Sequence, residues 1–175
     1  LSVVASDLNQ DGWLDLFVAN DFIYEDFIYI NDGTGKFNYR TQDMLKHTSF
    51  FSMGSDVADF NNDALPDIIS VDMLQEDLRY FKWESVMSGY DFYEKMARHG
   101  RHNQSIRNVL QLNMGDGTFA EIGELAGIPA TDWSWSPLMA DYNNDGWKDL
   151  FVSNGIRFKS NLDFLEYELD SIYNA

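Results

Sequence analysis

The sequence of 175 residues contains no cysteine, only 3 prolines and no apolar run of about 18 residues. Without cysteine, disulfides contribute nothing, so any extra stability has to come from the apolar core or from bound metal. Without a long apolar run, no membrane insertion is expected in this segment. The first residues lack the basic and apolar regions of a signal peptide. Because they also begin in a strand-like run without Met, we expect a fragment of a longer protein.

Basic residues are scarce, since 12 Lys and Arg against 29 Asp and Glu give a formal net charge of −17. A field of this sign repels phosphate backbones and anionic lipid surfaces, so nucleic acid is not an expected partner. An acidic excess of this size is either solvating surface or a set of cation sites, and position decides between them. Many of these acids recur at fixed spacing inside turns.

One sequence unit occurs three times, at residues 5–20, 58–73 and 140–155, and comparing the chain with itself reveals it. Each copy is an Ala, an acidic loop and a short apolar run. A second signature, an alternating run closed by a Gly-containing turn and a Phe, occurs at 27–37 and 109–119 and predicts a β-hairpin. Together these give four antiparallel strands per unit, which is a propeller blade. We therefore predict an all-β fold, a β-propeller fragment of about two and a half blades.

A predicted insert of about residues 74–108 separates the second unit from its hairpin signature. It lacks strand alternation and instead has apolar residues at steps of mostly three or four, which predicts one or two helices on a blade edge. A C-terminal helix is predicted over about 161–173, with Asn161 as a possible N-cap. The insert also holds six of the 12 basic residues, namely Arg79, Lys82, Lys95, Arg98, Arg101 and Arg107. These form either a recognition patch for an acidic ligand or, as we favour, a basic insert packed on an acidic face.

The acidic loops span residues 7–15, 59–67 and 141–149 and place side-chain oxygens at positions 1, 3, 5 and 9. Alternate side chains of a tight loop can converge on one point, and Gly at position 6 permits the reversal. Oxygen ligands without His or Cys predict Ca²⁺ rather than Mg²⁺, which retains its waters and demands octahedral geometry. The predicted side-chain ligands are Asp7, Asn9, Asp11 and Asp15, then Asp59, Asn61, Asp63 and Asp67, and finally Asp141, Asn143, Asp145 and Asp149.

The backbone carbonyl of position 7 is predicted to complete each ligand set, and this position is occupied by Trp13, Leu65 and Trp147. Their side chains are then free to pack on the blade. The second loop differs from the others because Ala64 stands at position 6. If this position needs a positive φ, Ala costs about 1 to 2 kcal/mol relative to Gly. The calcium affinity of the second loop is therefore left open.

The same residues also allow other interpretations. Asx-rich turns can cap strands without binding metal, but three copies with the same oxygen positions favour metal. An EF-hand needs Glu at position 12 and flanking helices, whereas Val18, Ser70 and Val152 stand there between strand-like runs. His99 and His102 have i, i+3 spacing, but no third ligand for a transition metal is evident.

The loops resemble the FG-GAP or VCBS repeats of integrin α-subunit propellers and of many bacterial secreted proteins, which read D-x-[DN]-x-D-G-x-x-D. Residues 109–155 look especially like bacterial ASPIC/UnbV-type proteins, relatives of cartilage acidic protein. The resemblance implies a propeller of about seven blades, calcium at the blade loops and export from the cytoplasm. The implied location is extracellular, periplasmic or at the cell surface. No shared catalytic residues are implied.

The leading functional prediction is a non-catalytic, calcium-binding module for recognition of, or adhesion to, a protein or glycan. The remaining blades of the same propeller are the other expected partner. The alternative is part of a carbohydrate-active enzyme with its active site on a propeller face. The sequence has no nucleophile elbow, phosphate loop or zinc signature, so no catalytic residue is assigned.

Overall fold

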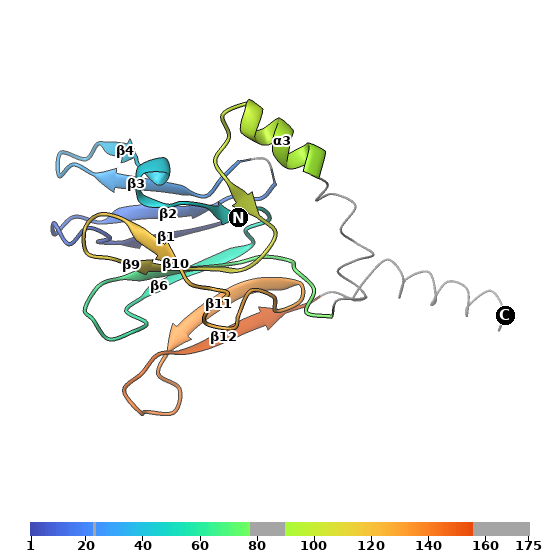
Figure 1. Cartoon of the computed structure of the whole chain (residues 1–175). Coiled ribbons are helices and arrows are strands. Elements are labelled where there is room, and N and C mark those ends of the chain that lie inside the picture. Colours follow the sequence, from blue (N-terminus) through green and yellow to red (C-terminus); the bar gives the residue numbers. More distant parts are fainter. Residues whose placement is uncertain (23, 78–89, 156–175) are drawn as a thin grey trace, which may run out of the picture.

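The computed structural model describes residues 1–22, 24–77 and 90–155 of the chain (Figure 1). Two antiparallel four-stranded sheets form most of it. The first sheet follows chain order and comprises β1 (Ser2–Ser6), β2 (Asp15–Ala19), β3 (Phe27–Asn31) and β4 (Phe37–Tyr39). The second has the order β6–β7–β9–β10 and comprises β6 (Gly54–Ala58), β7 (Asp67–Val71), β9 (Val109–Asn113) and β10 (Phe119–Glu121).

Smaller elements complete the described chain. A third antiparallel sheet pairs β11 (Ser134–Ala140) with β12 (Asp149–Asn154). A short parallel ladder pairs β5 (Thr48–Ser49) with β8 (Gln104–Ser105). The helices are α1 (Thr41–Met44), which follows β4, and α3 (Tyr90–Arg98), which lies between β7 and β8. No helix in the described ranges is long and apolar enough to cross a membrane.

The predicted blade is confirmed as the unit of the fold. Each four-stranded sheet runs through a strand, an acidic loop, two strands separated by a longer connection, a Gly-containing turn and a last strand. The third sheet contains the first two strands of such a unit. The described residues thus form a partial, all-β propeller that does not close into a ring.

The apolar core lies between successive blades, as sheets with two packed faces require. β7 is buried along its whole length, and its alternating side chains serve both neighbours. Ile68 packs with Phe17 and Ile28 of the first blade. Ile69 and Val71 point the other way and pack in a second cluster with Met139 of β11.

The first strands of the three blades lie beside one another. The hydroxyl groups of Ser2 on β1 and Ser55 on β6 are 2.6 Å apart, in hydrogen-bond contact. The backbone N–H of Met139 on β11 donates to Oδ2 of Asp56 on β6 at 2.7 Å. These polar contacts fix how each blade is placed relative to the next.

The two ends of the blades carry different connections (Figure 1). Because neighbouring strands are antiparallel, the acidic loops and the Gly-containing turns lie at one end of each blade. The connections from β2 to β3 and from β7 to β9 lie at the opposite end, together with α1 and the β5–β8 ladder. α3 lies within the predicted insert and at this second end. The predicted C-terminal helix over 161–173 lies outside the described residues.

Equivalent side chains brace the second end in both complete blades. Oδ1 of Asp26, just before β3, accepts the N–H of Asn20 at 2.9 Å. At the same place in the next blade, Oδ1 of Asn108 accepts the N–H of Asp72 at 2.7 Å. The repeat therefore includes a side-chain cap before the third strand, and this position is Asp26 in the first blade and Asn108 in the second.

Candidate cation-binding loops

The three acidic loops fold through the same set of hydrogen bonds. In the first loop, Oδ1 of Asp7 and Oδ1 of Asn9 both accept the N–H of Asp11, at 3.0 and 3.1 Å. Oδ2 of Asp7 accepts the N–H of Gly12 at 2.8 Å, and Oδ1 of Asp11 accepts that of Trp13 at 2.9 Å. The second and third loops repeat all four bonds. The predicted ligands at positions 1, 3 and 5 are thus gathered over each loop backbone.

The acid at position 9 has an additional structural role. Asp15 is fully buried, and its two oxygens accept the N–H groups of Leu8 and Asn31, each at 2.9 Å. Asp67 makes the equivalent bonds to Phe60 and Asn113, also at 2.9 Å. In the first and second blades this side chain therefore ties the loop to the end of the third strand. The loop pattern alone predicted only a ligand here.

The asparagine that ends the alternating run of each hairpin signature completes this attachment. Asn31 Nδ2 donates to the carbonyl of Leu14 in its own blade at 3.2 Å. Asn113 Nδ2 donates to the carbonyl of Leu8 in the previous blade at 2.9 Å. Its recurrence at the same place in both signatures was the signal that could have revealed this role.

In the third blade, Asp149 is only partly buried. One of its oxygens accepts the N–H of Tyr142 at 3.1 Å. The strand that would supply the second N–H, as β3 and β9 do for the other two loops, is not part of the described third sheet.

The loops carry concentrated negative charge. Burial raises the pKa of Asp15, and repulsion from Asp11 and Asp7 adds to this, although two backbone N–H groups oppose the shift. The pKa of Asp67 is raised in the same way. Across the described residues, none of the ion pairs with Lys, Arg or His involves a loop carboxylate. Within the described ranges, no loop carboxylate is therefore neutralised by an ion pair, although Lys148 lies in the third loop.

The donor atoms suit a hard cation, although they are engaged with the loop backbone. Carboxylate, amide and carbonyl oxygens are the ligands that Ca²⁺ takes, and a carboxylate oxygen that accepts one N–H keeps a second lone pair. Among the described residues, however, no three His, Cys, Asp or Glu side chains are grouped closely enough to hold a metal ion. Each loop thus brings together oxygens of the type that Ca²⁺ binds, but its acidic side chains do not lie close enough together to form a metal site as they stand.

Positions 6 and 7 of the loops show how the reversal is made. Position 6 has positive φ in all three loops, at 91° for Gly12, 68° for Ala64 and 91° for Gly146. Ala64 therefore occupies a conformation that disfavours a side chain. At position 7, the Trp13 indole covers Gly33 of the hairpin turn so closely that a Cβ there would lie 2.7 Å from Nε1. Leu65 packs on Gly115 in the same way.

The basic residues described at the opposite end are largely engaged. Arg98 pairs with Glu94 at 2.7 Å, and the Arg101 guanidinium lies 4.7 Å from the centre of the Tyr24 ring. The first contact lies within α3, whereas the second joins the insert to the first blade. A cavity of about 480 Å³ nevertheless remains between α3 and the β5–β8 ladder, and Arg101 lines it.

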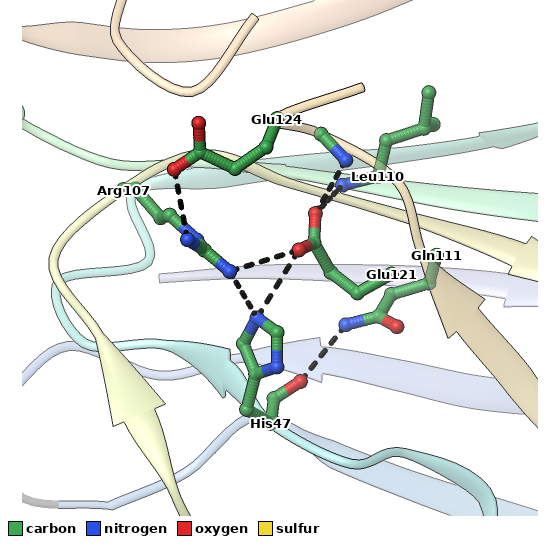
Figure 2. A network of polar contacts seen from close by, with 7 residues as sticks. His47, Arg107, Leu110, Gln111, Glu121 and Glu124 are labelled. Atoms are coloured by element: carbon green, nitrogen blue, oxygen red, sulfur yellow. Dashed lines mark hydrogen bonds and ion pairs between the residues drawn. The ribbon is translucent and has the colours of Figure 1, made fainter. Parts of the chain in front are cut away.

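Arg107 belongs to a network that ties the segment before β5 to the second blade (Figure 2). It pairs with Glu121 at 3.0 Å and with Glu124 at 2.9 Å, while His47 Nε2 lies 3.3 Å from Glu121. Burial alone would raise the pKa of Glu121, but bonds from His47 and two backbone N–H groups and the charge of Arg107 hold it below its usual value. Gln111 Nε2 donates to the carbonyl of His47 at 2.9 Å. The network is therefore structural.

The profile of a family described as FG-GAP-like repeat matches residues 7–70 and 99–152, which together make up more than half of the chain. The matched segments contain all three acidic loops, and the gap between them, residues 71–98, overlaps most of the predicted insert. No curated protein gives a significant match. The VCBS and ASPIC/UnbV resemblances remain predictions.

Proposed function

The chain belongs to the FG-GAP-like repeat family, and from this we propose that it is part of a calcium-binding propeller that recognises a protein or glycan outside the cytoplasm. In this proposal the module is non-catalytic. Its loops bind Ca²⁺ at one end of the blades, and its ligand is recognised by the loops and the insert.

One observation carries the calcium proposal: the three loops present the same oxygen donors through the same hydrogen bonds, and among the described residues none of their carboxylates forms an ion pair. The side chains at positions 1, 3, 5 and 9 and the carbonyls of Trp13, Leu65 and Trp147 would hold the ions. Bound Ca²⁺ supplies positive charge where the carboxylates repel one another.

Calcium in these loops stiffens the blades through the acid at position 9. Asp15 and Asp67 each link their loop to a third strand, so that a cation held by the loop also restrains the sheet. When the ion binds, the oxygens at positions 1, 3 and 5 give up some of their hydrogen bonds to loop N–H groups and contact the ion instead. An ion that binds only this folded arrangement stabilises it by mass action.

The recognition proposal is supported by the opposite end of the blades. The cavity beside α3 is within the size range of small-ligand sites and is lined by Phe50 and Tyr93 as well as by Arg101 and Gln104. Aromatic and polar side chains of this kind suit a glycan or a protein side chain. The resemblances to integrin α-subunits and to ASPIC/UnbV-type proteins support a secreted, adhesive role.

Calorimetric titration with Ca²⁺ tests the site assignment. Wild-type protein is expected to bind three ions, and Asp11→Ala and Asp145→Ala each remove one. Asp116→Ala is the matched control, because Asp116 lies in a hairpin turn and accepts its bonds from Thr118 outside any acidic loop. Equal stoichiometry in wild type and all three variants would show that the ligands are wrongly assigned. Glycan turnover that is lost on changing a single acid would instead favour the enzyme alternative.

A further inference from the structure

Neighbouring acidic loops are joined directly by hydrogen bonds. The Gln10 side chain, at position 4 of the first loop, donates through Nε2 to the carbonyl of Ala64 in the second loop at 2.5 Å. Asn62, at position 4 of the second loop, donates through Nδ2 to the carbonyl of Gly146 in the third at 2.8 Å. Both bonds run from position 4 of one loop to position 6 of the next, so they are a repeated feature of the fold.

The backbone at position 4 is shaped for this contact. The φ angle is 59° at Gln10, 60° at Asn62 and 60° at Asn144, so all three adopt the left-handed conformation. A non-glycine residue rarely adopts it. All three loops nevertheless keep this unfavourable conformation at position 4, and in two of them the side chain at this position donates to the next loop.

The accepting peptide also positions a predicted ligand. The carbonyl of Ala64 and the N–H of Leu65 belong to one planar peptide unit, and that N–H donates to Oδ1 of Asp63 at 2.8 Å. In the third loop, the N–H of Trp147 holds Oδ1 of Asp145 at the same distance. Fixing the carbonyl from the neighbouring loop therefore also fixes the group that orients the position 5 carboxylate.

On these grounds we infer that Gln10 and Asn62 are positioning residues that couple the cation sites of adjacent blades, so that filling one loop favours filling the next. The inference rests on the proposed calcium function. Gln10 and Asn62 each lie between two predicted ligands of their own loop, so an ion that orders that loop also orders the donor. Coupling of this kind is reciprocal between the two sites.

The third loop provides a matched control. Asn144 has the same φ as Gln10 and Asn62, but within the described ranges its side chain makes no hydrogen bond. Replacing it by Ala removes the same kind of side chain from the same backbone conformation without breaking a bond between loops.

The experiment measures Ca²⁺ affinity of the third loop by calorimetry in two backgrounds. In Asp11→Ala the second and third loops remain, whereas in Asp11→Ala/Asp63→Ala only the third remains. Asn62→Ala is expected to lower third-loop affinity by between about twofold and tenfold in the first background, as loss of one neutral hydrogen bond implies. It is expected to have no effect in the second background, where the neighbouring site is empty. Asn144→Ala should change neither.

Two results overturn the inference while leaving calcium binding intact. One is an Asn62→Ala titration identical to that of Asn144→Ala in the first background. The other is an equal loss of affinity in both backgrounds, which would make Asn62 a structural support that does not respond to the neighbouring ion. If the wild-type protein binds no Ca²⁺, the proposed function itself fails. Circular dichroism of every variant verifies that each is folded.

Discussion

At the residue scale, Asp26 is the clearest case of a side chain whose charge does not suit its surroundings. It is fully buried, and Ser52 donates to its second oxygen at 2.9 Å. Burial, with repulsion from Asp72 as a smaller cause, raises the pKa of Asp26 to about 7. The equivalent position in the next blade is Asn108, a neutral residue that makes the same cap.

This comparison predicts that Asp26→Asn stabilises the protein at neutral pH. An acid with a raised folded-state pKa keeps its proton in the folded state while the unfolded chain loses it. The stability it contributes is therefore full below pH 3.8 and is lost as the pH rises toward 7. Asp26→Asn should remove this part of the pH dependence and raise unfolding free energy on the order of 2 kcal/mol at pH 8. Urea unfolding from pH 4 to pH 8 measures both effects.

The reciprocal variant Asn108→Asp is the control. Nδ2 of Asn108 donates to the carbonyl of Ile128 at 3.0 Å and to Thr131 at 2.7 Å, so a carboxylate would lose both bonds. It should destabilise the protein and make its stability more dependent on pH. If both variants shift stability in the same direction, the two caps are not equivalent.

Ala64 gives a second prediction at this scale. Its φ of 68° is one that Gly adopts without strain, so Ala64→Gly should raise unfolding free energy by about 1 kcal/mol. Ala58→Gly is the matched control, because Ala58 lies in β6 and Gly there should lower stability by about 0.5 to 1 kcal/mol. Denaturant midpoints compare the two, and a loss of stability in Ala64→Gly would contradict the strain argument.

At the element scale, the strands could be predicted from the sequence because a short apolar run follows each acidic loop and each hairpin contains a Gly turn between its two strands. The side chains at positions 1, 3 and 5, which gather over the loop backbone, could also be predicted, because they recur at the same spacing in all three loops. The second role of Asp15 could not, because its partner Asn31 is reached only once β3 is paired with β2. The bond from Gln10 to Ala64 depends on how two blades pack, which no local pattern contains.

The insert gives the prediction at this scale. Ser70 of β7 pairs with Val109 of β9, so the chain leaves and re-enters the sheet at adjacent positions. Replacing residues 76–101 by a Gly/Ser linker should preserve the sheets, because loop-closure entropy changes slowly with length. Cooperative thermal unfolding and an unchanged calcium stoichiometry are the expected results. Unfolded protein would show that the insert is part of the core.

Gln104 is the control for this replacement, since it lies just beyond the exchanged segment. Its side-chain amide donates to the carbonyls of Phe22, Tyr24 and Ser49 at distances from 3.2 to 3.4 Å. Gln104→Ala should therefore destabilise the protein more than loss of the insert does. The comparison separates the contribution of Gln104, which joins two blades, from that of the replaced segment.

At the scale of the whole molecule, the excess of acid makes calcium a stabiliser through charge as well as through ligation. Three bound ions add +6 to the formal charge of −17 and leave −11. At a calcium concentration 100-fold above the dissociation constant, each site adds about 2.7 kcal/mol. The melting temperature in about 5 mM Ca²⁺ should exceed that in chelator, with a smaller rise in Mg²⁺. Identical melting temperatures in all three conditions would show that the loops do not bind Ca²⁺.

The bonds from Gln10 to Ala64 and from Asn62 to Gly146 also bear on how such a protein tolerates rearrangement of its gene. The first and second blades each give a side-chain donor to the blade after them, and the second and third each offer a main-chain acceptor to the blade before them. Because a main-chain acceptor exists whatever residue stands there, as Ala64 in place of Gly illustrates, the junction makes little demand on the sequence of the incoming blade. Duplication or exchange of a whole unit would therefore preserve the contact at both of its new borders.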